Sequence, residues 1–193
     1  MIKAIIFDFG NVICTVDNNI FLERISKFAD KTISELKELI YLSDLPQKYE
    51  TGLISSDEFF NEIVRKCSLS ISKHEFIKAY TGIFTPIQTT FDLIRKLKAK
   101  YKIALLSNTS EWDFKYGEKP IEIFDLFDAV SLSFNVKAMK PENKIFLDSL
   151  SKLNLKPEQC IYIDDIEEYV EAANQMGIHG IHYISYEKLI DFL

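Results

Sequence analysis

The sequence contains little of what small secreted proteins and membrane-spanning proteins need. Its 193 residues include only 3 cysteines, 6 glycines and 5 prolines. Cys14, Cys67 and Cys160 are widely spaced and odd in number, so they predict neither a disulfide framework nor a zinc site. No apolar run approaches the roughly 18 residues that a membrane-spanning helix requires, and no signal peptide is recognisable. We therefore expect a chain that works in a reducing, cytoplasmic setting without a membrane partner.

Positive charge is also scarce. Lys and Arg number 23 against 29 Asp and Glu, which gives a formal net charge of -6 at pH 7. An obligate nucleic-acid partner is not expected, because binding nucleic acid requires a basic surface that neutralises phosphates. A small anionic ligand needs only a few local positive groups and stays compatible with this composition.

Apolar residues, in contrast, are plentiful: 47% of the chain is hydrophobic, with 15 Phe and 9 Tyr. Short apolar runs that fit buried strands occur at residues 3–8, 103–106, 129–132 and 160–163, with a shorter edge run at 180–183. Helical patterns alternate with the later runs, at residues 91–98, 143–153 and 170–176. This alternation predicts an α/β fold in which helices cover both faces of a doubly wound parallel sheet.

The segment 17–80 shows a different pattern. It contains no convincing strand but several amphipathic helical stretches, at residues 21–28, 33–42 and 59–67. Ser56, which precedes two acidic residues, is expected to begin the last of these helices. We interpret 17–80 as an all-helical cap inserted after the first strand, and we assign residues 1–16 and 81–193 to the α/β core.

Polar side chains stand where the predicted strands end. In chain order they are Asp8, then Ser107 and Asn108, and then Asp164 and Asp165. Lys140 precedes the helix that leads into the fourth strand. Because ligands of open parallel sheets bind beyond the carboxyl ends of the strands, we expect these side chains to converge on one crevice.

Such a set suits phosphoryl transfer. Carboxylates that would repel each other can share a Mg²⁺ ion, which prefers oxygen ligands. The metal and the lysine offset the charge of a phosphate, while the hydroxyl group and backbone amides hold its oxygens. One carboxylate is then free to attack and form an acyl-phosphate that water hydrolyses. The expected cofactor is therefore Mg²⁺, and the expected partner is a small phosphorylated metabolite.

Several segments resemble, in order, the sequence motifs of the haloacid dehalogenase superfamily. They are Phe-Asp-Phe-Gly-Asn-Val-Ile at 7–13, Leu-Ser-Asn-Thr at 106–109, Met-Lys-Pro-Glu at 139–142, and Ile-Asp-Asp at 163–165 with the helix that follows it. The stretch 49–55 is similar to a segment of that superfamily's helical caps. The resemblance covers essentially the whole chain and implies a Rossmann-like core, a helical cap and a hydrolase.

The resemblance also implies roles for the acidic residues. Asp8 would be the nucleophile and a Mg²⁺ ligand. Asp165 would be the second direct ligand, with Asp164 beside it, either direct or through water. The backbone carbonyl of Gly10 would supply another metal contact.

The other residues of the resemblance would bind the substrate's phosphate. Ser107 and Asn108 would hold phosphate oxygens. Lys140 would tie the phosphate to the side chain of the nucleophile and would therefore take part in catalysis.

One position departs from the pattern of the superfamily's phosphatases. They usually carry a second aspartate two residues after the nucleophile, which protonates the leaving group, and here that position is Gly10. General acid–base help is typically worth ~10²–10⁴ in rate. The Asp-x-Gly-Asn-Val variant resembles a branch that includes sugar-phosphate phosphatases. We therefore predict either a preference for sugar 1-phosphates, whose leaving group needs less protonation, or an acid recruited from the cap.

Two alternative functions remain open. A metal-independent 2-haloacid dehalogenase would use the same Asp8 and would need an arginine near the site for the substrate's carboxylate. A non-catalytic relative would bind a ligand or a partner protein, and Gly10 is the main argument for it. The pattern of residues does not indicate an oligomeric state.

Overall fold

The computed structural model describes residues 1–192, and one parallel sheet forms its centre. The strands of this sheet are β1 (Ala4–Phe7), β4 (Lys102–Ser107), β5 (Ala129–Leu132), β6 (Cys160–Asp164) and β7 (His179–His182). They lie in the order β5-β4-β1-β6-β7, and each neighbouring pair is parallel. The predicted α/β fold with a doubly wound parallel sheet is therefore confirmed, with β7 at an edge as expected.

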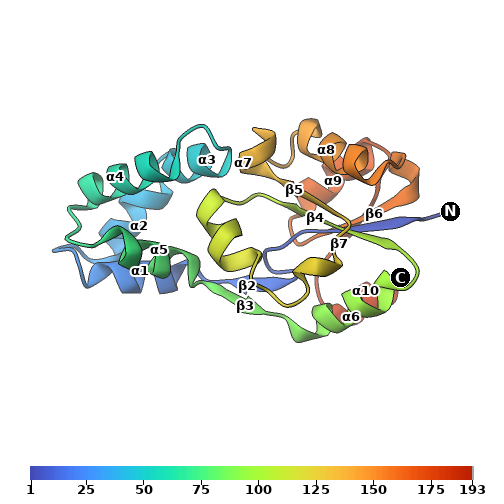
Figure 1. Cartoon of the computed structure of the whole chain (residues 1–193), viewed down its shortest axis with the longest axis horizontal. Helices are drawn as coiled ribbons and strands as arrows, with labels where there is room; N and C mark the ends of the chain where they lie inside the picture. The colour runs from blue at the N-terminus through green and yellow to red at the C-terminus, as the bar shows by residue number, and fades with distance from the viewer. Residues whose placement is uncertain (193) are drawn as a thin grey trace.

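Helices cover both faces of the sheet (Figure 1). The helices on one face are α6 (Gln88–Lys98) and α10 (Tyr186–Ile190), and those on the other are α8 (Asn143–Leu153) and α9 (Glu167–Gln175). In β1, Ile5 and Phe7 belong to the apolar cluster that α6 and α10 complete. Ala4 and Ile6 belong to the cluster on the side of α8 and α9. Burial on both faces explains why β1 is a continuous apolar run without polar alternation.

A group of helices lies at the opposite end of the molecule from the sheet (Figure 1). These helices are α1 (Asn18–Ser26), α2 (Ile33–Tyr41), α3 (Leu45–Glu50), α4 (Ser56–Cys67) and α5 (Lys73–Thr81). They enclose an aromatic core of their own, in which the Phe21 and Phe76 ring centroids lie 5.4 Å apart in an edge-on arrangement. Sequence periodicity anticipated α1, α2 and α4 but missed the shorter α3 and also α5.

A short antiparallel ribbon connects this helical group to the sheet. It consists of β2 (Cys14–Val16) and β3 (Phe84–Pro86), which pair from Cys14 opposite Pro86 to Val16 opposite Phe84. The chain thus leaves and re-enters the α/β part through neighbouring strands. The exact boundaries assigned from sequence, 17 and 80, stay a prediction.

The remaining elements are short. They are a π-helix (Asp113–Glu118), two 3₁₀ turns (Phe124–Leu126 and Pro157–Gln159) and α7 (Ser133–Val136). Within residues 1–192, no helix has the length and apolar character needed to cross a membrane.

Helix α4 begins at Ser56, as predicted, and the residue before it supplies the cap. Ser55 is the N-cap: the Glu58 N–H donates to Ser55 Oγ at 3.2 Å, and the Ser55 N–H donates to Glu58 Oε2 at 2.8 Å. Ser56 instead lies inside the structure, where its hydroxyl is 2.8 Å from the Tyr49 hydroxyl and donates to Glu111 Oε2 at 2.5 Å. The reciprocal hydrogen bonds between Ser55 and Glu58 satisfy two backbone donors that the start of the helix would otherwise leave free.

We expect the substitution Ser55→Ala to lower the free energy of unfolding by about 1 kcal/mol, because a cap hydrogen bond is lost. Urea unfolding followed by circular dichroism measures the change. Ser34→Ala is the matched control: Ser34 is exposed within α2, and its side chain makes no hydrogen bond to residues 1–192. Equal destabilisation by both substitutions would contradict the capping role of Ser55.

Candidate active site

The carboxylates at the strand ends converge as predicted. Strands β1 and β6 are neighbours with Phe7 opposite Ile163, so the residues that follow them leave the sheet side by side. Asp8, Asp164 and Asp165 each offer one oxygen, and these oxygens all lie within 4.8 Å of one another. This is a spacing at which carboxylates can share one cation.

Lys140 pairs with two of these three carboxylates. Its Nζ lies 2.5 Å from Asp8 Oδ1 and 2.7 Å from Asp164 Oδ2, and the residue is only 4% exposed. The ammonium also lies 5.1 Å from the ring centroid of Tyr169 and 5.9 Å from that of Tyr162. A buried ammonium needs such partners, because burial without compensation would favour its neutral form.

The two adjacent aspartates have different surroundings. Asp164 is fully buried and accepts hydrogen bonds from Lys140, from the Tyr162 hydroxyl and, at 2.8 Å, from the Ile166 N–H. Asp165 is partly exposed, and its Oδ2 accepts a hydrogen bond of 3.0 Å from Asn11 Nδ2. Asp164 therefore anchors Lys140, whereas Asp165 has more freedom to face a ligand.

The electrostatic balance of the site is negative. Burial raises the pKa of Asp8 to about 7, a rise that Lys140 opposes and Asp164 increases. Burial by itself lowers the pKa of Lys140, but the charges of Asp8 and Asp164 outweigh it and raise this pKa above its usual value. One ammonium cannot offset three carboxylates. The oxygen-only donor set and its surplus of negative charge fit a hard divalent cation such as Mg²⁺.

The polar residues at the end of β4 also lie at this site, and both have partners in the protein. The Lys140 N–H donates to Asn108 Oδ1 at 2.8 Å, and Asn108 Nδ2 donates to the Lys140 carbonyl at 3.2 Å. Asn108 thus holds the backbone of the lysine. Ser107 Oγ donates to Glu118 Oε1 at 3.3 Å. Phosphate binding by Ser107 and Asn108 stays a prediction, as does the metal contact of Gly10.

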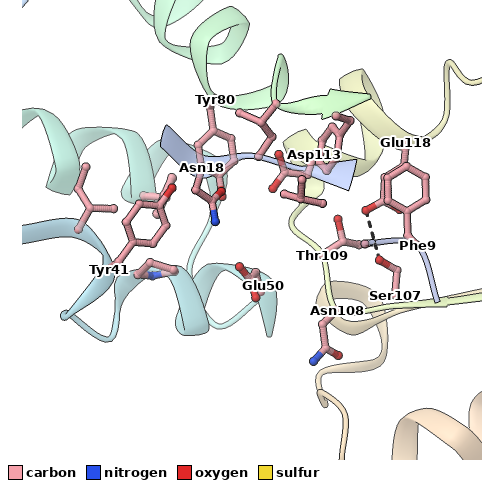
Figure 2. Close-up of a pocket in the computed structure, with 17 residues that line it drawn as sticks. Phe9, Asn18, Tyr41, Glu50, Tyr80, Ser107, Asn108, Thr109, Asp113 and Glu118 are labelled. Atoms are coloured by element: carbon pink, nitrogen blue, oxygen red, sulfur yellow. Dashed lines mark hydrogen bonds between the residues drawn. The ribbon is translucent and has the colours of Figure 1, made fainter. Parts of the chain in front are cut away.

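A cavity of about 140 Å³ adjoins these strand ends. Its walls come from both parts of the fold: Gly10, Ser107 and Asn108 from the sheet side, and Tyr41 and Tyr80 from the helical side. Figure 2 shows the tyrosines and the strand-end residues on opposite sides of this space. A ligand bound at the strand ends would therefore extend toward the helices.

The charged residues that line the cavity are all acidic. They are Glu50, Asp113 and Glu118, and no Lys or Arg contributes to the described lining. Burial raises the pKa of Glu50 to about 8, that of Asp113 to about 7 and that of Glu118 to about 8. Sequence reasoning missed all three, because isolated acidic residues outside a motif are indistinguishable from solvated surface positions.

Comparison with known proteins gives the family. The sequence profile of the haloacid dehalogenase-like hydrolases matches residues 2–177. A D-ribitol-5-phosphate phosphatase from Bacteroides thetaiotaomicron is 26% identical over 186 residues, which cover 92% of this chain and 89% of the relative.

Solved structures agree on the fold. A haloacid dehalogenase family enzyme from Bacteroides thetaiotaomicron, in complex with magnesium and inorganic phosphate, superimposes with a TM-score of 0.85 and 24% identity over 98% of this chain and 99% of the other. An L-2-haloacid dehalogenase from Xanthobacter autotrophicus, with chloropropionic acid covalently bound, gives a TM-score of 0.69 and 17% identity over 98% of this chain and 81% of the other. Taken with the geometry of the strand ends, the profile match shows that this chain belongs to the haloacid dehalogenase-like hydrolases.

Proposed function

We propose that this chain is a Mg²⁺-dependent phosphatase that hydrolyses small phosphorylated metabolites. The observation that carries the proposal is the convergence of Asp8, Asp164 and Asp165, two of which, Asp8 and Asp164, also pair with the buried ammonium of Lys140. A relative that covers most of the chain, the D-ribitol-5-phosphate phosphatase, acts on a substrate of this class.

The acidic residues would divide the work between metal binding and attack. Asp8, Asp165 and Asp164, together with the carbonyl of Gly10, would hold Mg²⁺. When bound, the ion stabilises negative charge on the phosphoryl oxygens. An oxygen of Asp8 would attack phosphorus and form an aspartyl phosphate, which water then hydrolyses.

Lys140 would have two functions in this scheme. Its contacts with Asp8 and Asp164 hold both carboxylates in place. Its positive charge would also attract the phosphate toward the nucleophile. Ser107 ends the neighbouring strand β4, and Asn108 follows it. Both side chains would contact the phosphate oxygens.

The charge of the cavity indicates which leaving groups fit. Acidic residues and tyrosines line it without a Lys or Arg among the described lining residues. Hydroxyl groups can hydrogen bond to such a lining, whereas a second anionic group would find no cation there to offset its charge. This favours uncharged, hydroxyl-bearing leaving groups. The narrower assignment to sugar 1-phosphates rests on Gly10 and stays a prediction.

The lack of a cation in the cavity lining also argues against the dehalogenase alternative. A 2-haloacid carries a carboxylate, and a pocket that binds it needs a cation or backbone donors. The charged side chains that line the cavity are all acidic, so the lining supplies no cation for that purpose. Similarity to the Xanthobacter dehalogenase at 17% identity shows a shared fold only.

We expect Asp8→Asn to reduce phosphate release from p-nitrophenyl phosphate by at least about 10³-fold, because the nucleophile is lost. Removal of Mg²⁺ with EDTA should abolish the wild-type rate, and added Mg²⁺ should restore it. Asp57→Asn is the matched control, since Asp57 is an exposed residue of α4 that should leave the rate unchanged.

Two other outcomes of this experiment would replace the proposal. Release of chloride from 2-chloropropionate without Mg²⁺, and without phosphatase activity, would identify a dehalogenase. Inactivity in both assays would identify a non-catalytic relative.

We also expect fructose 1,6-bisphosphate to be a poorer substrate than fructose 6-phosphate. Its second phosphate would have to enter a cavity whose lining lacks a cation, so kcat/KM should be at least about tenfold lower. Phosphate release at saturating Mg²⁺ measures both values. A bisphosphate that is hydrolysed as well as the monophosphate would show that the cavity does not receive the leaving group.

A further inference from the structure

Position 10, where glycine replaces the usual acidic side chain, is sterically open. A Cβ atom built on Gly10 would meet only Val16 Cγ2 at 3.5 Å and Asp8 Oδ2 at 3.9 Å, which are ordinary contact distances. The backbone therefore does not require glycine there. If the leaving group is protonated in this enzyme, the proton must come from another residue that borders the same space.

Glu118 is the carboxyl group best placed to supply it. It ends the π-helix that follows β4, is only 2% exposed and lines the cavity together with Gly10 and Ser107. Its Oε1 accepts the hydrogen bond from Ser107, while its Oε2 has no partner within residues 1–192. Figure 2 shows Glu118 joined to Ser107 on the strand-end side of the cavity.

A buried carboxyl oxygen without a partner is uncommon in folded proteins, because its desolvation is not compensated. Burial raises the pKa of Glu118 to about 8, a rise that the nearby hydroxyls of Thr109 and Ser107 oppose and the charges of Asp113 and Asp8 increase. The group therefore carries a proton at neutral pH, as a general acid must before the reaction.

The other acidic residues of the cavity are less suitable. Asp113 also has one oxygen without a partner within residues 1–192, Oδ1, but its bonded oxygen accepts from Ser110, at 2.8 Å, and not from Ser107. Glu50 belongs to α3 on the helical side. Glu118 is the one of the three that contacts Ser107, the proposed phosphate ligand. Contact with Ser107 places its carboxyl group beside the expected position of the phosphate.

We propose that Glu118 is the catalytic acid–base, in place of the side chain that Gly10 lacks; this rests on the phosphatase function proposed above. In the first step an Asp8 oxygen bonds to phosphorus, the bond from phosphorus to the leaving oxygen breaks, and that oxygen takes the proton of Glu118. In the second step water attacks the aspartyl phosphate and gives a proton to the Glu118 carboxylate, while the bond from phosphorus to Asp8 breaks. Phosphate leaves, and both residues return to their initial states.

The proposal changes the expected substrate preference. With an acid available, the wild-type enzyme should hydrolyse glucose 6-phosphate, an ordinary alkyl phosphate, as well as glucose 1-phosphate. The preference for the 1-phosphate that Gly10 predicts should emerge only when Glu118 is replaced.

The test is Glu118→Gln, assayed with glucose 6-phosphate and p-nitrophenyl phosphate. We expect kcat/KM for glucose 6-phosphate to fall about 10²–10⁴-fold. With p-nitrophenyl phosphate it should fall less than about tenfold, because p-nitrophenolate leaves without protonation. The aryl substrate should also show a burst of p-nitrophenol followed by slow turnover, since the aspartyl phosphate then lacks its base.

Asp113→Asn is the matched control, a second buried acid of the same cavity, and it should not change the ratio of kcat/KM between the two substrates. Equal losses with both substrates in Glu118→Gln, without a burst, would indicate a structural role and overturn the proposal. The same conclusion would follow if Asp113→Asn reproduced the selective loss.

Gly10→Asp provides a test that does not depend on the folding of the Glu118 variant. If Glu118 is the acid, this substitution should change wild-type kcat/KM for glucose 6-phosphate less than about tenfold, and in the Glu118→Gln background it should restore activity. An increase of about 100-fold or more in the wild-type background would show that the enzyme lacks an acid. Absence of any phosphatase activity in the wild type would instead refute the proposed function itself.

Discussion

The contact of the Lys140 ammonium with Asp8 and Asp164 is the interaction on which the site depends. The lysine comes from the loop before α8, whereas Asp8 directly follows β1 and Asp164 ends the neighbouring strand β6. Asn108, at the end of β4, binds the backbone of the same lysine through both ends of its amide. Three adjacent strand ends are thus joined through one buried residue. Loss of its charge would leave two buried carboxylates facing each other without compensation.

Much of the fold and part of the site could be predicted because their sequence signals are direct. Strands buried on both faces produce continuous apolar runs, and parallel strands place their carboxyl ends along one edge of the sheet. Asp8, Lys140 and Asp164 therefore meet as expected. The contacts of Tyr162 and Tyr169 with Lys140 could not be predicted, because an aromatic residue in a strand or helix is most simply explained by packing.

The acidic cavity was also outside the reach of sequence reasoning, for a physical reason. Asp113 and Glu118 lie on a π-helix, which has no 3.6-residue periodicity to reveal a buried face. Glu50 approaches them only because α3 packs across from the strand ends. The two ends of the resulting site differ in charge: the lysine and the proposed metal supply positive charge at one end, and protonated carboxyl groups line the other. A phosphate monoester with an uncharged leaving group matches this polarity in one orientation only.

The segment that carries Glu118 also depends on the helical group. Trp112, which directly precedes the π-helix, is part of the aromatic core formed by α1–α5, and its backbone N–H donates to the Tyr49 hydroxyl at 3.1 Å. The other end of the π-helix contacts β4 through Ser107. An aspartate at position 10 would lie between the end of β1 and the residues of β2, whereas Glu118 is held by the helices and the strand ends together. The position of an acid in this place therefore depends on how the helices pack over the strand ends. Protonation would then be coupled to enclosure of the substrate, which also excludes the water that would hydrogen bond to the carboxyl group.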